Sequence, residues 1–134
     1  MNWRLILTLS LFGVAMGIAT VALIPSNVEP LAWLVIFVIC AYAIARRATS
    51  RFFLHGLFVS LTNSIWITAS HVVLFDTYIA HHPQEAAMTA SMPFSAHPRI
   101  LMVVIGPLIG LASGVVLGAF CTIAAKLTRR SARG

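Results

Sequence analysis

The sequence predicts an all-α membrane protein, a single domain in which four transmembrane helices cross the bilayer. Of its 134 residues, 60% are apolar and 9% are charged, whereas a soluble domain carries roughly 25% charged residues. Four apolar stretches have lengths close to or above what a hydrocarbon core about 30 Å thick requires. In the last stretch, glycines recur at every fourth position, a pattern typical of membrane helices that pack closely together.

The first helix is expected at residues 4–24, a segment of about 20 largely apolar residues. A cleaved signal peptide is the alternative interpretation. Its apolar core is usually shorter, and the residues before Pro25 form a poor cleavage site. Gly13 and Gly17 form a close-approach motif, which predicts that this helix packs against the glycines of the fourth helix.

The next two helices are expected at residues 31–45 and 52–80. A turn rich in Pro, Ser and Asn precedes the second helix, and a basic connection that begins at Arg46 joins it to the third. The third stretch would be about 43 Å long as one continuous helix, which is more than the hydrocarbon core needs. Pro83 and Pro93 bracket a short interfacial helix, expected at the outer surface between the third and fourth spans.

The fourth helix is expected at residues 99–126 and is interpreted as the helix against which the others pack. Its regularly spaced glycines lie along one helix face. Each glycine costs about 1 kcal/mol of helix propensity relative to Ala, so the series indicates a ridge where another backbone makes van der Waals contact. The ridge can serve within one chain or between two chains. The glycines predicted at close helix contacts are Gly13, Gly17, Gly106, Gly110, Gly114 and Gly118.

Lysine and arginine residues are distributed unequally over the connections. If four helices cross the membrane, Arg4, the cluster that begins at Arg46 and the C-terminal basic cluster fall on one side, and only Arg99 falls on the other. The positive-inside rule therefore predicts that both termini are cytoplasmic. The net charge of +6 is expected to meet anionic lipid headgroups rather than nucleic acid, because the basic residues lie beside apolar spans.

Several polar side chains of the third stretch fall on one helix face. Ser60, Ser64, His71 and Tyr78 lie within about 40° of one line at 100° per residue, and we expect this stripe to face the interior of the bundle. One interpretation of His71 is a functional residue, a proton carrier or a ligand of metal or haem. The other interpretation is a neutral histidine that forms a hydrogen bond with a neighbouring helix.

A carboxylate lies on the opposite side of the same stretch. Asp76 is expected to pair with Arg99, the sole basic residue at this end, and Glu85 competes for the same partner. We interpret the pair as a structural link between the third and fourth spans. A pair that gates access of a substrate is the alternative.

A cluster of histidines and methionines near the short helix is the best indication of ligand chemistry. Imidazole and thioether groups suit Cu(I), and Met88 and Met92 lie four residues apart on one helix face. Packing at the membrane surface is the alternative, because methionine commonly fills such positions. Haem would need a second histidine to join His71. The candidate metal ligands are His71, His81, His82, Met88, Met92 and His97.

No catalytic motif stands out in the sequence. Its three carboxylates form no general acid–base pair at helical spacing, and phosphate-binding loops, dinucleotide fingerprints and nucleophile elbows are absent. Cys40 and Cys121 lie within apolar runs, without a neighbouring cysteine or metal ligand. We therefore expect a protein without enzymatic activity or a resident cofactor.

One resemblance can be stated for the last two spans. It is carried by His55-Gly56, Trp66-Ile67-Thr68, His71, Tyr78-Ile79-Ala80, His82-Pro83, Pro98-Arg99, Gly106-Pro107, Gly110, Gly114 and Gly118. In these residues the chain resembles a group of small bacterial four-span membrane proteins without an assigned activity. The resemblance covers residues 52–128 and implies the bacterial inner membrane, but no ligand or catalytic residue. Four-span multidrug exporters are similar in length only, because the first span here carries no carboxylate.

These features predict a non-enzymatic membrane scaffold whose glycine-rich helix supports self-association or the binding of a partner protein. The alternative is a small transporter, or a metal- or haem-handling protein, with the His/Met cluster as its entrance and the polar stripe as its path. A polar cavity that reaches His71 would favour transport or ligand binding. A dry and filled interior would favour the scaffold.

Overall fold

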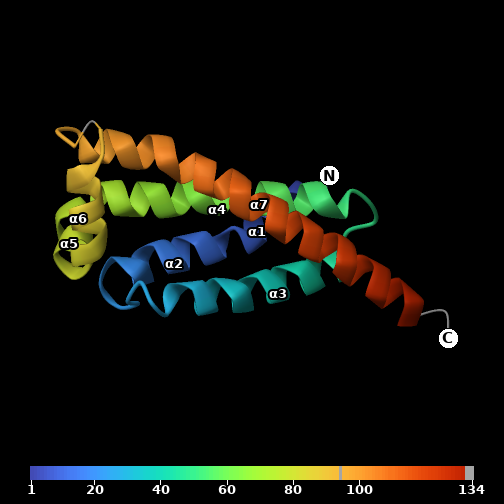
Figure 1. Cartoon of the computed structure of the whole chain (residues 1–134). Coiled ribbons are helices and arrows are strands. Elements are labelled where there is room, and N and C mark those ends of the chain that lie inside the picture. The colour runs from blue at the N-terminus through green and yellow to red at the C-terminus, as the bar shows by residue number, and fades with distance from the viewer. Residues whose placement is uncertain (94, 132–134) are drawn as a thin grey trace.

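The computed structural model describes residues 1–93 and 95–131, and every regular element within them is a helix (Figure 1). Residues 1 and 131 lie at one end of the molecule, here called the termini end, and α5 and α6 form the opposite end. In chain order the helices are α1 (Trp3–Leu9), α2 (Leu11–Ala22), α3 (Glu29–Arg47), α4 (Phe52–Val73), α5 (Phe75–His81), α6 (Pro83–Ser91) and α7 (Pro98–Ser131).

Four helical segments are long and apolar enough to cross a membrane. They are Trp3–Ala22, which comprises α1 and α2, then Glu29–Arg47, Phe52–Val73 and Pro98–Thr128. Large apolar side chains cover the outside of these segments, as expected for surfaces that meet lipid chains rather than water. The expectation of an all-helical protein with four helical segments long and apolar enough to span a membrane is therefore confirmed.

The first span is interrupted at Ser10, where a single continuous helix was expected. Ser10 ends α1 and precedes α2, and its hydroxyl donates to the Leu7 carbonyl at 2.8 Å. A break exposes backbone N–H groups that lipid cannot satisfy. Asn63 of α4 supplies an acceptor from outside the helix: its Oδ1 accepts a hydrogen bond from the Gly13 N–H at 3.0 Å.

The third span is shorter than the expected helix over 52–80. Helix α4 ends at Val73, Leu74 has φ −101° and ψ 32°, and α5 begins at Phe75. In one continuous helix, His71 and Tyr78 would lie about 10 Å apart along the axis. The break instead lets the two rings stack with centroids 4.1 Å apart, so α5 folds over the end of the bundle and contacts α2 and α6 (Figure 1).

The glycines of α7 all face α4. A side-chain atom added at Gly106 would meet Thr68, one at Gly110 would meet Ser64, and one at Gly114 would meet Leu57. Gly118 lies against Phe53. A side-chain atom added at Gly56 of α4 would in turn meet the backbone of Gly118 first. The α7 backbone therefore lies directly against side chains of α4 along most of the interface, and the two backbones meet at Gly56 and Gly118.

The glycines of the first span have a different partner from the one expected. Gly13 lies against Asn63 and Gly17 lies against Ser70 and Ile67, all on α4. The predicted pairing of Gly13 and Gly17 with the glycines of α7 is wrong. Helix α4 lies between the two glycine motifs, because it offers small or polar side chains to both of its neighbours.

The tightest packing lies at the termini end, where α1, α3, α4 and α7 meet. Ile6, Ile44 and Leu117 have no exposed surface, and Cys40 and Cys121 are equally buried free thiols. From this core, α3 and α7 diverge toward the α5–α6 end (Figure 1). Divergence of these two helices opens the site described below.

Arg51 is the one non-glycine residue with positive φ (φ 55°, ψ 41°) among those the structure describes. The left-handed conformation costs an L-residue about 1–2 kcal/mol, so replacement by Gly relieves strain. We expect Arg51→Gly to raise the free energy of unfolding by up to about 1 kcal/mol. Arg46→Gly, a loss of the same charge from within α3, should lower it by about as much. Thermal unfolding in detergent, followed by circular dichroism, measures the stability of both variants. Midpoint shifts of the same sign in the two variants would contradict the assignment of strain to Arg51.

Candidate functional site

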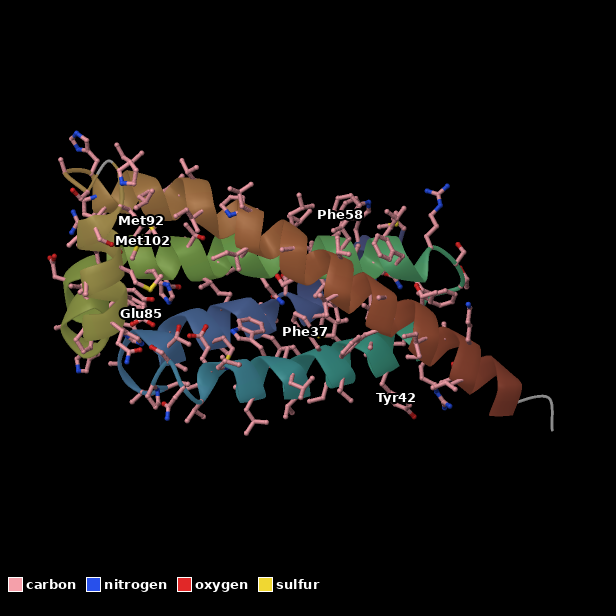
Figure 2. All side chains as sticks on the ribbon, viewed as in Figure 1. Phe37, Tyr42, Phe58, Glu85, Met92 and Met102 are labelled. Carbon is pink, nitrogen blue, oxygen red and sulfur yellow. The ribbon has the colours of Figure 1, made fainter. Side chains whose placement is uncertain are left out.

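A cleft of about 640 Å³ lies between the diverging halves of α3 and α7. Helix α4 forms its floor, and α5 and α6 close the wide end (Figures 1 and 2). In Figure 2, Phe37, Glu85, Met92 and Met102 point into this space, whereas Tyr42 points away from it. The residues that line the cleft belong to α3–α7 and the segments that join them, and α1 and α2 contribute none.

The walls of the cleft are mostly apolar along its length. Helix α3 contributes Leu34 and Phe37, and α7 contributes Leu101, Ile105 and Ile109. The lining on α7 extends from Pro98 to Phe120, about 33 Å of helix. A long apolar walled space of this kind fits a hydrocarbon chain better than a hydrated solute.

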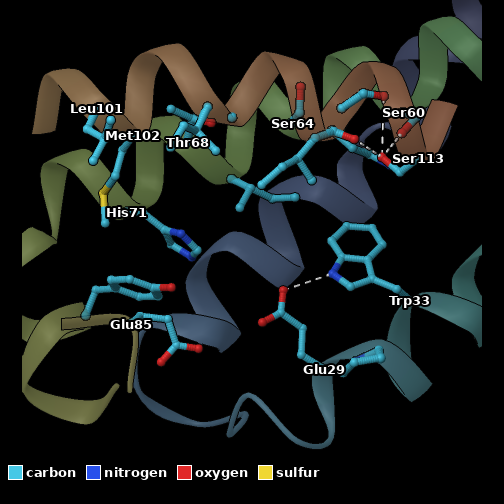
Figure 3. A pocket seen from close by; sticks show the side chains of 18 of the residues that line it. Glu29, Trp33, Ser60, Ser64, Thr68, His71, Glu85, Leu101, Met102 and Ser113 are labelled. Atoms are coloured by element: carbon cyan, nitrogen blue, oxygen red, sulfur yellow. Dashed lines mark hydrogen bonds between the residues drawn. The ribbon is translucent and has the colours of Figure 1, made fainter. Parts of the chain in front are cut away.

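The narrow end is closed by two contacts. The rings of Phe37 and Phe120 meet edge to face with centroids 6.4 Å apart. Beside them, Ser60 and Ser113 are joined by a hydrogen bond of 2.9 Å (Figure 3). Since the Ser113 hydroxyl donates to the Ile109 carbonyl at 2.6 Å, it accepts from Ser60. Both hydroxyl hydrogens therefore have acceptors, Ser113 Oγ for Ser60 and the Ile109 carbonyl for Ser113, as polar groups within an apolar span require.

Three stacked rings form the wide end. Tyr78 lies between His71, at 4.1 Å, and His82, at 4.4 Å, with interplanar angles of 22° and 21°. His71 and Tyr78 line the cleft, and His82 is 3% exposed behind them. The stack joins the end of α4 to the junction of α5 and α6, which fixes α5 over the bundle.

The tautomer of His71 follows from its partner. The Thr20 hydroxyl donates its hydrogen to the Met16 carbonyl at 2.7 Å, so the contact of 2.9 Å between His71 Nε2 and Thr20 Oγ1 has the histidine as donor. Nδ1 of the neutral ring is then an acceptor. Hydrogen bonding to the neighbouring span agrees with the interpretation of His71 as a neutral histidine.

His82 has the opposite tautomer. Its Nδ1 donates to the Tyr78 carbonyl at 2.9 Å, so Nε2 carries the lone pair. This Nε2 atom is buried and has no hydrogen-bond partner. A buried acceptor without a donor is uncommon in folded proteins and calls for an explanation.

Two carboxylates lie at the same end of the cleft (Figure 3). Glu29 Oε1 accepts a hydrogen bond of 3.1 Å from the Trp33 indole, and Glu85 Oε2 is buried without a partner. Burial, and secondarily the negative charges of Glu85 and Glu29, raise the pKa of the Tyr78 phenol to about 12. The phenol therefore stays neutral at physiological pH, in a place of negative potential.

The ion pair expected between Asp76 and Arg99 is present outside the cleft. Arg99 Nη2 and Asp76 Oδ2 are 3.6 Å apart, with the two side chains 55% and 91% exposed. The Arg99 guanidinium also lies over the Phe75 ring, 5.2 Å from its centroid. An exposed ion pair of this length contributes at most about 1 kcal/mol to the free energy of unfolding. Its more important consequence is that Arg99 pairs with Asp76 and not with Glu29 or Glu85.

The structure brings the predicted polar stripe together and separates two of the six predicted metal ligands from the others. Ser60, Ser64, His71 and Tyr78 all line the cleft. Of the metal candidates, His71, Met88 and Met92 line it, and His82 stacks on Tyr78 behind it. His81 is exposed and donates to the Thr77 carbonyl, and His97 borders a separate hollow beside Asp76 and Arg99. Within residues 1–93 and 95–131, no three His, Cys, Asp or Glu side chains are placed to hold a metal ion.

Some residues of this region were not singled out from the sequence. Asn63 is 2% exposed, lines the cleft and bonds to Gly13, and Glu29 was placed only in a turn. An amide in the middle of an apolar span is itself a signal, because such groups are expensive in lipid. Glu29 gives no comparable signal, since its approach to Glu85 depends on tertiary packing. Comparison with protein-family profiles, curated protein sequences and solved structures found no match to this chain.

Proposed function

We propose that the protein binds an amphiphilic small molecule with one hydrocarbon chain, which enters the cleft sideways from the bilayer. The observation that carries the proposal is the distribution of polarity in the cleft: the walls on α3 and α7 are mostly apolar, the α4 floor carries small polar side chains, and both carboxylates lie at the α5–α6 end. A ligand that satisfies both parts needs a chain and a headgroup. The cleft volume of about 640 Å³ falls within the usual range for small-molecule sites, about 300–1,000 Å³.

The use of the glycines supports ligand binding over a scaffold. The ridge of α7 suggested self-association because a bare backbone can receive a helix of another chain. Here Gly106, Gly110, Gly114 and Gly118 lie against α4 of the same chain. The ridge is thereby engaged internally, and the cleft is the larger unfilled feature.

We further propose that the protein lies in a bacterial inner membrane with both termini in the cytoplasm. The basic residues Arg4, Arg46, Arg47, Arg51 and Lys126 belong to the termini end, which the positive-inside rule assigns to the cytoplasm. On this assignment the headgroup site faces the outer leaflet. Carriage of the ligand across the bilayer would require the narrow end to open.

The test uses Trp33, which lies in the cleft, as a fluorescent reporter. In a variant with Trp3→Phe and Trp66→Phe, Trp33 is the remaining tryptophan. We expect 11-bromoundecanol, added to this variant in phosphatidylcholine nanodiscs, to quench Trp33 saturably. Ile105→Phe with Ile109→Phe narrows the cleft and should weaken this quenching at least tenfold.

The matched control places the same bulk on the lipid side of the same helix. Val103 and Val104 are 53% and 57% exposed and lie outside the cleft, so Val103→Phe with Val104→Phe should leave the quenching curve unchanged. Linear, unsaturable quenching that both double variants share would overturn the proposal. So would a dimer in the nanodiscs whose cross-links involve cleft residues, because a second copy would then occupy the space.

A further inference from the structure

We infer that the headgroup of the bound amphiphile is cationic, an amine or ammonium group held at the α5–α6 end between Glu29 and Glu85. This inference rests on the proposed amphiphile binding and adds the chemical class of the ligand. Three features of that end of the cleft favour a cation: its hydrogen-bond acceptors, its charge and its aromatic surface.

Four polar side chains at this end offer acceptor atoms. When ionised, both glutamates accept hydrogen bonds only, and in the neutral rings the tautomers deduced above make Nδ1 of His71 and Nε2 of His82 acceptors too. Glu85 Oε2 and His82 Nε2 are buried without any donor. Leaving buried acceptors unpaired costs about 1–3 kcal/mol each, more for a charged group. A ligand that brings N–H donors removes part of this cost, whereas a carboxylate or phosphate brings none.

The charges at this end are unbalanced in the direction that favours a cation. The described charged side chains here are Glu29, Asp76, Glu85 and Arg99. Asp76 and Arg99 neutralise each other at 3.6 Å, which leaves the two glutamates. No Lys or Arg lines the cleft, so its described lining carries two negative charges, although the chain as a whole carries +6.

An aromatic ring adds a second source of attraction. Trp33 lines the cleft and its indole donates to Glu29 (Figure 3), and a cation near an aromatic face gains about 0.5–2 kcal/mol. Both faces of the Tyr78 ring are covered by His71 and His82, so Tyr78 contributes its hydroxyl rather than its ring face.

An organic cation fits this arrangement better than a metal ion. A metal needs several ligand atoms converging on one point within about 2–2.5 Å, and no three His, Cys, Asp or Glu side chains are placed to do so in the described part of the chain. An alkylammonium group is larger and can meet the two carboxylates and the Trp33 ring from a wider space. Its hydrocarbon chain would then lie along Leu101 and Ile105 toward the narrow end.

The test compares three twelve-carbon amphiphiles as competitors of 11-bromoundecanol in the same nanodiscs. We expect dodecylammonium to displace the probe from Trp33 at a concentration at least tenfold lower than dodecanol, and dodecanoate to be the weakest. In Glu85→Gln, dodecylammonium should displace the probe at a concentration close to that of dodecanol. The affinity for dodecanol itself should stay within twofold of its value in the parent protein. Asp76→Asn removes an exposed carboxylate at the same end but outside the cleft, and should leave the preference for ammonium unchanged.

The outcomes separate the two proposals. Equal displacement by the ammonium and the alcohol would overturn the inference about charge and leave amphiphile binding standing. An equal loss of preference in Asp76→Asn and Glu85→Gln would also overturn it, since general surface charge would then account for the effect. Failure of all three compounds, together with failure of the probe itself to bind, would overturn both.

Discussion

A single methyl group added at Gly56 should destabilise the fold by about 1–3 kcal/mol. The added Cβ would lie 2.8 Å from the backbone N and Cα atoms of Gly118 and 2.9 Å from Sγ of Cys121. Backbone atoms cannot rotate out of the way, so α4 and α7 would have to separate where they approach most closely. Separation would also loosen the contacts of Leu117, which is fully buried beside this point.

Gly114→Ala is the matched comparison for Gly56→Ala. Its Cβ first meets Cδ1 of Leu57, at 2.8 Å, and only then a carbonyl oxygen at 3.1 Å. A leucine side chain can rotate, and Ala gains about 1 kcal/mol of helix propensity over Gly, so this variant should stay within about 1 kcal/mol of the parent. Chemical unfolding in mixed micelles, followed by circular dichroism, measures both. Equal stability of the two variants would contradict a backbone contact at Gly56.

Removal of the His55 side chain should cost about 1–3 kcal/mol. His55 is 3% exposed, and both of its ring nitrogens are occupied. Nδ1 donates to the Arg51 carbonyl at 2.9 Å, so Nε2 is the acceptor for the backbone N–H of Asn2 at 3.0 Å. This bond links the start of α1 to the first turn of α4. His55→Ala therefore leaves a cavity and an unpaired N–H.

His81→Ala separates this effect from the loss of any histidine. His81 also donates through Nδ1 to the carbonyl four residues earlier, Thr77, at 2.8 Å, but its side chain is exposed and makes no other hydrogen bond. Its removal should change the free energy of unfolding by less than about 0.5 kcal/mol. Thermal midpoints of the two variants in one detergent give the comparison. Midpoints that fall together would show that the link between Asn2 and His55 contributes nothing.

The membrane spans could be predicted from sequence because each depends on local composition. Apolar length alone places α3 and α7 near their observed bounds and α4 at its observed start, and Pro83 marks the start of α6. The breaks at Ser10 and Leu74 could not be predicted in this way. The break at Ser10 is stabilised by Asn63, a residue distant in sequence, which accepts a hydrogen bond from Gly13. The break at Leu74 is stabilised by the stacking of Tyr78 on His71, a contact that exists only once the helix has broken.

The candidate site was only partly predictable for the same reason. Helical periodicity places Ser60, Ser64 and His71 on one face, because all three belong to one helix. Whether that face is filled or hollow depends on the angle between α3 and α7, which no local pattern encodes. Glu29 and Glu85 reach the same space only because the connection after α2 and the helix α6 fold to the same end.

The contact between Phe37 and Phe120 gives the cleft a pivot. Between Phe120 and Pro98, α7 extends about 33 Å, so a tilt of about 5° at the aromatic pair would move the far tip of the helix by roughly 3 Å. Such a displacement is comparable to the thickness of an aromatic ring. The width available to a bound molecule at the α5–α6 end would then depend on the size of the side chain at position 120, at the other end of the cleft.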